Sequence, residues 1–187
     1  MNEHTLGEKI SENPDIFSEI IDNYEEKLMR YIMRSTDISE IDAENLLQDI
    51  FIKIYQYINE YDSQYSFSSW IYRIAHNMII DHYRKNQKES ENISLEDEEY
   101  TNIITSMSDG NSPHHDLKRG DIKNCVQKAI SLLRKEYKEI ILLKCIEGYS
   151  YEEISDILRI PVWTASTLIN RARKELRENL EKLHCNS

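Results

Sequence analysis

Residues 148–176 read GYSYEEISDILRIPVWTASTLINRARKEL, and this stretch decides the fold of the C-terminal part of the chain. Ser150, followed by Glu153 three positions later, forms a capping box that predicts the start of a short helix. Pro161 suits the first turn of a longer helix. A short helix, a tight turn and a longer helix make up the helix-turn-helix motif, so the stretch predicts a domain of this type.

The longer helix has two distinct sides. Small or apolar residues fall on one side and are expected to pack on the preceding helices: Val162, Ala165, Ile169, Ala172, Leu176, Leu180 and Leu183. The other side contains Trp163, Thr167, Asn170, Arg171 and Lys174. Hydroxyl, amide and cationic groups near a helix N-terminus suit base edges and phosphates in a DNA groove. The pattern also allows a small helical bundle with a solvated polar face.

The net charge of −11 argues against DNA binding by the chain alone. Affinity for DNA comes largely from cations that displace counterions at phosphates, and a duplex repels a negative chain at long range. Only one cation, Arg171, occurs among residues 160–171. Either the chain does not bind DNA, or something else supplies the positive charge.

The composition favours an all-α fold. The 187 residues include only four Gly and three Pro, while 40% are hydrophobic and 30% are charged. No stretch approaches the roughly twenty apolar residues that span a bilayer, and the N-terminal residues lack a signal-peptide pattern. We therefore expect a cytoplasmic protein without direct membrane insertion. Cys125, Cys145 and Cys185 are an odd number without paired spacing and are predicted to be reduced thiols.

The N-terminal part predicts three helices. Asn13 as N-cap with Pro14 in the first helical position begins one helix, and Ser39 with Asp42 begins a second. Residues 62–69 form a polar loop. After the loop, a third helix directs an apolar stripe inward: Trp70, Ile71, Ile74, Ala75, Met78 and Ile79.

Residues 89–116 differ in character from the segments around them. They contain acidic runs, Ser, Asn, Gly110 and Pro113 with few apolar residues, which is typical of a flexible linker. Helical patterning returns near Leu117 and reaches Gly148, which is predicted to end a helix. The chain is thus predicted to form two small helical domains, residues 1–88 and 117–187, joined by a flexible acidic linker. His114 and His115 are read as exposed linker residues, with weak metal binding as the alternative.

The third helix interleaves aromatic and cationic residues outside its apolar stripe. Tyr72, Arg73, His76, Asn77 and Arg84 lie off that stripe. Aromatic rings that stack on bases, beside cations that neutralise phosphates, are what binding of single-stranded DNA requires. The alternative is that the aromatic residues belong to the core and that the cations only complement the helix dipole.

The two predicted domains resemble parts of one known family. The segment AENLLQDIFIKIYQYINEYD, followed by YSFSSWIYRIAHNMIIDHYRK, resembles the second conserved region of bacterial RNA polymerase sigma factors. The segment LLRKEYKEIILLKCIEGYSYEEISDILRIPVWTASTLINRARKEL resembles the fourth. The resemblance covers roughly residues 13–88 and 117–183, and the small size is similar to the extracytoplasmic-function group, whose members often serve in stress responses.

The resemblance implies a transcription initiation factor with no catalysis or cofactor of its own. Polymerase docking falls on the second helix, at Glu44, Asn45, Leu47, Gln48, Asp49, Phe51 and Ile52. The resemblance assigns melting and single-stranded binding of the −10 element to Phe67, Ser69, Trp70, Tyr72, Arg73, His76, Asn77, Arg84 and Lys85. Reading of the duplex −35 element falls on Lys144, Trp163, Ser166, Thr167, Asn170, Arg171, Arg173 and Lys174. The implied partners are core RNA polymerase, promoter DNA and an anti-sigma factor.

The chain departs from the family pattern in its last helix, and two other functions are compared with the family assignment. Relatives usually have PVGTVKSRLHRAR where this chain has PVWTASTLINRAR, so the chain either reads an unusual −35 sequence or makes weak contacts there and relies on other elements. An autonomous helix-turn-helix regulator is the main alternative, and the acidic linker and the basic end of the third helix argue against it. An enzyme is disfavoured because His76 and His82 do not share a helix face as metal ligands would, and no Gly-rich phosphate loop is present.

Overall fold

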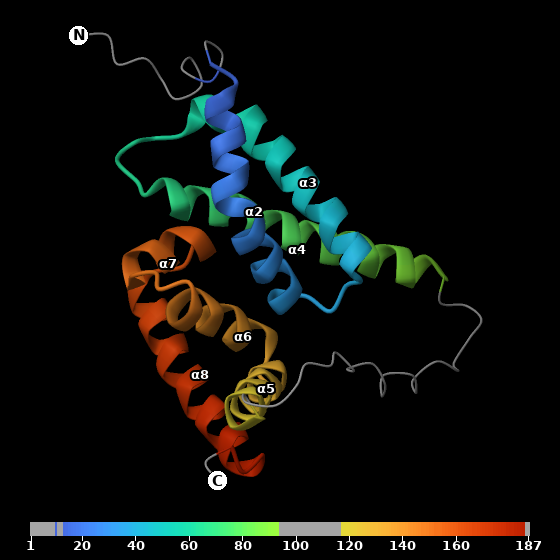
Figure 1. The fold of residues 1–187 in the computed structure, drawn as a ribbon, viewed down its shortest axis with the longest axis vertical. Helices are drawn as coiled ribbons and strands as arrows, with labels where there is room; N and C mark the ends of the chain where they lie inside the picture. Colours follow the sequence, from blue (N-terminus) through green and yellow to red (C-terminus); the bar gives the residue numbers. More distant parts are fainter. Residues whose placement is uncertain (1–9, 11–12, 94–116, 186–187) are drawn as a thin grey trace.

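The computed structural model describes residue 10 and residues 13–93 and 117–185, which form two groups of helices (Figure 1). The N-lobe, residues 13–93, contains α2 (Asp15–Ser35), α3 (Glu40–Tyr57), the short 3-10 helix η1 (Ile58–Glu60) and α4 (Phe67–Ile93). The C-lobe, residues 117–185, contains α5 (Leu117–Ser131), α6 (Lys135–Ile141), the π-helix η2 (Leu142–Ile146), α7 (Tyr151–Leu158) and α8 (Val162–Lys182). No strand occurs in the described residues, so the predicted all-α class is confirmed.

The predicted caps position three of the helix starts. The Ser39 hydroxyl accepts the N–H of Asp42 at 3.1 Å, at the start of α3. Ser150 and Glu153 form the predicted capping box of α7. At α2 the assigned helix begins at Asp15, the Asn13 side chain accepts the N–H of Asp15 at 3.1 Å, and Pro14 has helical angles (φ −59°, ψ −23°), which is the geometry expected of an N-cap followed by Pro. The sequence signals of local structure are therefore accurate to within one residue at these sites.

The predicted loop of residues 62–69 is shorter than expected, because α4 begins at Phe67. The Ser66 carbonyl accepts the N–H of Trp70 at 3.0 Å, and the Ser66 hydroxyl accepts the N–H of Ser69 at 3.4 Å. Ser66 thus caps α4, which makes the last residues of the expected loop helical. At its other end α4 continues to Ile93, into the predicted linker, and residues 94–116 lie outside the described part of the chain.

Buried apolar side chains of the two lobes form one connected core. In the N-lobe the fully buried side chains come from all three long helices and include Leu28, Ile32, Ile50, Ile54, Ile71 and Ala75. In the C-lobe they include Ile140, Ile154, Ile157, Ala165, Ile169 and Ala172. The expectation that Val162 packs inward is wrong: its side chain is 42% exposed. Pro161 and Trp163 are exposed too, so the first turn of α8 lies outside the core.

Two residues with positive φ angles shape the C-lobe. Gly148, at φ 83°, follows η2 and ends this helical segment as predicted. Arg159, at φ 52°, is a non-glycine residue in the left-handed region and forms the turn between α7 and α8. The turn places α8 across the short α7, which completes the predicted helix-turn-helix.

The two lobes pack against each other. In Figure 1, α7 lies beside the first half of α4, and α6 lies beside the end of α2. None of the described helices is long and apolar enough to cross a membrane.

Candidate nucleic-acid and polymerase interfaces

Part of the face of α4 that lies off its apolar stripe is covered by the C-lobe. The Tyr72 hydroxyl donates to the Glu147 carboxylate at 2.7 Å, and Nη1 of Arg73 lies 2.8 Å from Oδ1 of Asp156. Tyr72 is only 1% exposed. A face that the sequence pattern assigns to single-stranded DNA therefore contacts acidic side chains of the same chain.

A second group of contacts surrounds Glu139 of α6. Its Oε1 accepts the Tyr31 hydroxyl at 2.6 Å and lies 2.6 Å from Nδ1 of His76. Nearby, Nζ of Lys138 lies 3.6 Å from Asp37, at the end of α2. Glu139 thus joins two N-lobe helices to α6.

Two serines at the start of α4 extend the contact between the lobes. The hydroxyls of Ser68 and Tyr149 are 2.5 Å apart, and the Ser69 hydroxyl donates to Glu153 at 3.4 Å. The rings of Tyr149 and Tyr72 meet edge to face, 5.1 Å between centroids. We call the contacts of Tyr31, Ser68, Ser69, Tyr72, Arg73 and His76 with Glu139, Glu147, Tyr149, Glu153 and Asp156 the interlobe contact.

Burial in the interlobe contact raises the pKa of three tyrosines. Burial raises the pKa of the Tyr72 hydroxyl well above its usual range, and Glu147 raises it further. Burial likewise raises the pKa of Tyr149 and of Tyr31, and Glu139 adds to the rise at Tyr31. These hydroxyls are therefore held neutral, as hydrogen-bond donors or acceptors, while the lobes are together.

Part of the predicted −10 site stays accessible. Asn77, Arg84 and Lys85 are exposed. Asn77 lines a hollow of about 250 Å³. Residues from α3, η1, α4 and the C-lobe turn line this hollow: Lys53, Tyr57, Glu60, Trp70, Arg73, Ile74, Asn77, Met78, Asp81 and Arg159. Trp70 also lines this hollow but is only 4% exposed, so its ring is packed in the N-lobe and is not available as a stacking surface.

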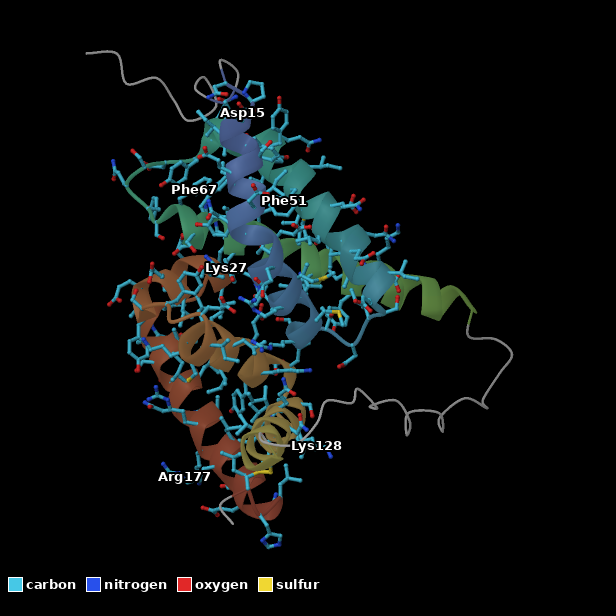
Figure 2. All side chains as sticks on the ribbon, in the orientation of Figure 1. Asp15, Lys27, Phe51, Phe67, Lys128 and Arg177 are labelled. Atoms are coloured by element: carbon cyan, nitrogen blue, oxygen red, sulfur yellow. A yellow bond between two sulfur atoms is a disulfide. The ribbon has the colours of Figure 1, made fainter. Side chains whose placement is uncertain are left out.

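Aromatic rings form the floor beside this site. Phe67, labelled at the start of α4 in Figure 2, stacks on Trp70 at 5.8 Å between centroids. The ring of Tyr61 meets both, at 5.0 and 5.6 Å. The alternative that Trp70 belongs to the core is therefore correct for its position, and Tyr61 and Phe67 are the partly exposed rings of the group.

The predicted docking face on α3 divides into buried and exposed residues. Glu44, Asn45, Gln48 and Asp49 are exposed, and Ile52 is 56% exposed. Leu47 and Phe51 are buried, so they can position this face but cannot touch a partner. Exposed large apolar residues at the same face, Ile41 and Tyr55, were missed by sequence reasoning. Their spacing from Ile52, eleven and three residues, is the helical signal that could have identified them.

The exposed face of α8 agrees with the sequence pattern. Trp163, Thr167, Asn170, Arg171, Arg173 and Lys174 are exposed, and Ser166 is partly exposed. The Thr167 hydroxyl donates to the Trp163 carbonyl at 2.9 Å. Lys144, from η2, donates to the Tyr149 carbonyl at 2.9 Å and lies over the Tyr151 ring. An ammonium group has three donors, so this bond leaves others for a phosphate.

The prediction of three reduced thiols is wrong for two of them. Cys125 of α5 and Cys185, after α8, form a disulfide with Cα atoms 5.8 Å apart, seen as the sulfur pair at the lower end of Figure 2. The packing of α5 on α8 brings together two cysteines that are 60 residues apart, which spacing rules cannot reveal. Cys145 is free and exposed. Among the described residues, no group of three or more His, Cys, Asp or Glu is arranged to hold a metal ion.

Two regions of the chain match known protein families. The family description "Sigma-70 region 2" matches residues 20–89, and "Sigma-70, region 4" matches residues 123–176. The ECF RNA polymerase sigma factor SigW of Bacillus subtilis is 35% identical over 178 residues, which cover 90% of this chain and 91% of the relative. The chain belongs to the extracytoplasmic-function group of RNA polymerase sigma factors.

Other relatives agree with this assignment. The sigma-E factor of Haemophilus influenzae is 27% identical over 98% of this chain and 97% of its own length. A solved structure of the sigma factor RpoE from Bartonella quintana, in complex with the anti-sigma factor NepR, has the same fold, with a TM-score of 0.69 at 21% identity over 88% of this chain and 96% of that chain. The chain thus belongs to a family of non-enzymatic transcription initiation factors and directs RNA polymerase to promoters, and the autonomous regulator is not favoured.

Proposed function

We propose that three faces of this sigma factor divide promoter recognition between them. The α3 face around Gln48 and Ile52 docks on core RNA polymerase. The α4 face and its hollow at Asn77 melt and hold the −10 element. The exposed face of α8 reads the −35 element. This division assigns docking and melting to residues 1–88, the connection to residues 89–116 and −35 reading to residues 117–187.

The interlobe contact is the observation that carries the proposal. Ser69, Tyr72, Arg73 and His76 offer hydroxyls, a guanidinium and an imidazole, and carboxylates of the C-lobe bond each of them. Carboxylates and phosphates are both anionic oxygen acceptors, and Arg bonds either in the same planar geometry. The C-lobe carboxylates therefore occupy the positions that we assign to the backbone of the −10 strand.

In this arrangement DNA has no access to the covered face of α4. Promoter melting then requires that the lobes separate, which breaks the interlobe contact. A partner that binds the separated form better than the closed form shifts the chain toward it by that difference in affinity. We assign this role to core polymerase, which would engage the exposed α3 face first.

The net charge of −11 fits a factor that acts only within a polymerase complex. The acidic chain gains little from a few phosphate contacts, because free binding to DNA depends on net positive charge near the duplex. A polymerase that holds both lobes over one promoter gives each a high effective concentration at its DNA element, so modest contacts suffice. The same need for polymerase and DNA implies a cytoplasmic protein.

We propose an anti-sigma factor as the second protein partner. A groove of about 460 Å³ lies between the lobes, and its walls come from α2, α5, α6 and η2. The lining is largely apolar and includes Met33, Val126, Ile130, Leu142 and Ile146, with Arg34, Asp37 and Lys138 among its polar residues. An inhibitor seated there would contact both lobes at once and would hold the interlobe contact closed. The Bartonella quintana relative, solved with an anti-sigma factor, supports the class of partner.

The Asn77→Ala variant tests the proposed function. Asn77 is exposed, lies outside the apolar core and has no part in the interlobe contact. The variant should bind core polymerase as the wild type does, yet open the −10 region less, as measured by permanganate reactivity of unpaired thymines. The exposed Asn124→Ala on α5 is the matched control and should open the promoter normally. Equal permanganate reactivity for Asn77→Ala and wild type would contradict the −10 assignment.

A further inference from the structure

Trp163 is the most exposed of the exposed large apolar side chains in the described residues, at 72%. Val162 beside it is 42% exposed. Both lie in the first turn of α8, where no acidic residue is present and no side chain caps the helix. The exposed indole and the neighbouring valine offer apolar surface whose burial against a partner would contribute binding free energy.

The side chain of Trp163 belongs to the strip of α8 that we assign to DNA. Trp163, Thr167, Asn170 and Lys174 are spaced by four, three and four residues, so they lie on one side of the helix, and all four are exposed. Ala165, Ile169 and Ala172 fill the opposite side and are fully buried. Trp163 is thus the first member of the strip, at the helix end that enters most deeply in a helix-turn-helix complex.

A hydrogen bond within the strip makes the surface next to Trp163 largely apolar. The Thr167 hydroxyl donates its proton to the Trp163 carbonyl at 2.9 Å, so Thr167 adds a methyl group rather than a free donor. The indole ring has one N–H donor and no acceptor. Thr164 and Ser166 are only partly exposed, and the fully exposed amide and cationic groups follow at Asn170, Arg171 and Lys174.

The base edges of a duplex offer one apolar group to such a surface. In the major groove, guanine, cytosine and adenine show hydrogen-bond donors and acceptors, and only thymine adds a methyl group. An indole placed against a polar base edge would remove water from donors and acceptors without replacing the hydrogen bonds, which is unfavourable. An indole placed against a thymine methyl buries apolar surface on both partners.

We propose that Trp163, supported by Val162, reads the 5-methyl group of a thymine in the −35 duplex. The inference rests on the proposed function of α8 and adds the base that its first turn selects. Asn170 and the cations that follow it contact adjacent bases and phosphates. The apolar first turn therefore selects the base, while the rest of the strip provides affinity for the duplex.

The test compares thymine with deoxyuracil, which pairs alike and lacks only the methyl group. Core polymerase carrying the wild-type chain first selects −35 sequences from a randomised promoter library. Each selected thymine is then replaced by deoxyuracil, one at a time, and binding by the complex is measured. At one position the wild type should lose about fourfold in affinity, the ratio that corresponds to ~0.8 kcal/mol for one buried methyl group.

Variants of Trp163 separate a methyl contact from other uses of the ring. Trp163→Phe keeps an apolar ring without an N–H and should remain sensitive to deoxyuracil, whereas Trp163→Ala should bind both duplexes equally. Sensitivity retained by Trp163→Ala would overturn the proposal. Sensitivity absent from the wild type would overturn it too, as would a loss of polymerase affinity in Trp163→Ala without DNA, since the ring would then serve a protein partner.

Arg171→Ala distinguishes failure of this inference from failure of the proposed function. If Arg171→Ala weakens binding to the selected duplex and deoxyuracil has no effect, α8 reads DNA and only the role of Trp163 is wrong. If neither Arg171→Ala nor any Trp163 variant changes binding, α8 does not read the −35 element and both fail. Unchanged thermal unfolding of each variant, expected for exposed side chains, confirms that the fold is intact.

Discussion

The guanidinium of Arg73 on α4 lies 2.8 Å from the carboxylate of Asp156 on α7, and both side chains are about four-fifths buried, at 23% and 22% exposed. This pair joins a side chain that we assign to −10 DNA with an acidic group of the C-lobe. The chain thus covers one of the two proposed DNA-binding faces with the lobe that carries the other, while the α3 and α8 faces stay exposed.

Removing two acidic groups from the interlobe contact should favour the separated form. Asp156→Asn combined with Glu147→Gln removes the charge from the partners of Arg73 and Tyr72. A hydrogen bond to a charged group contributes about 1.5–3 kcal/mol, so the closed form should lose at least tenfold in relative population. Amide hydrogen exchange in the middle of α4 should become faster. Asp49→Asn on the exposed α3 face is the matched control, and equal rates in the double variant and wild type would contradict the proposed role of these contacts.

The closed form should weaken above about pH 10, the ordinary pKa of tyrosine. Burial raises the pKa of Tyr72, Tyr149 and Tyr31 in the closed form. The closed form therefore binds more protons than the open or unfolded chain once pH exceeds about 10, and its stability falls as pH rises further. Below that pH these groups add no pH dependence. Scattering measurements across pH 8–11 should show expansion only at the alkaline end.

Tyr72→Phe provides the comparison for this pH dependence. The variant lacks one ionisable hydroxyl and should expand less steeply than the wild type at alkaline pH, although its closed form loses the bond to Glu147 at every pH. An identical pH profile for the two proteins would mean that Tyr72 is not buried between the lobes in solution.

Docking on polymerase should depend on the exposed α3 face. Gln48→Arg places a bulky cation at the centre of this face without touching the core, because Gln48 is exposed. We expect at least a tenfold loss of affinity for core polymerase, with thermal unfolding unchanged. Gln127→Arg, the same exchange at an exposed position of α5, should bind as the wild type does. Full affinity in a folded Gln48→Arg protein would show that this face does not dock on polymerase.

Reduction of the disulfide should destabilise the C-lobe. Cys125 and Cys185 close a loop of about 60 residues, and a disulfide of this type typically contributes 2–4 kcal/mol by restricting the unfolded chain. Urea unfolding with and without a reductant should therefore differ by about that amount. Cys145→Ser, which alters the free thiol, should leave this difference unchanged. No difference between oxidised and reduced protein would show that the bond contributes nothing to stability.

Local features were predictable from the sequence because they depend on near neighbours. The caps at Ser39 and Ser150 and the left-handed turn at Gly148 each follow from residues within a few positions. The exposed strip of α8 follows from helical spacing, since Trp163, Thr167 and Asn170 lie opposite a row of small residues that pack inward. The family resemblance needed only the order of two such segments.

Features that depend on contacts between distant segments were not predictable. Tyr72 and His76 lie off the apolar stripe of α4, as expected, yet they are buried because a separate lobe covers them. The disulfide depends on the meeting of α5 with the end of α8. Val162 falls on the apolar side of its helix, but the first turn of α8 lies outside the core, so helical periodicity alone gave the wrong environment.

Binding of a promoter duplex should be measured for the free chain and for its complex with core polymerase. We expect no sequence-specific binding by the free chain at about 150 mM salt, near physiological ionic strength, because the proposed −10 face is covered and the net charge is −11. With core polymerase, specific binding should appear and Arg171→Ala should weaken it. Specific nanomolar binding by the free chain would show that it binds promoters without polymerase, as an autonomous regulator does.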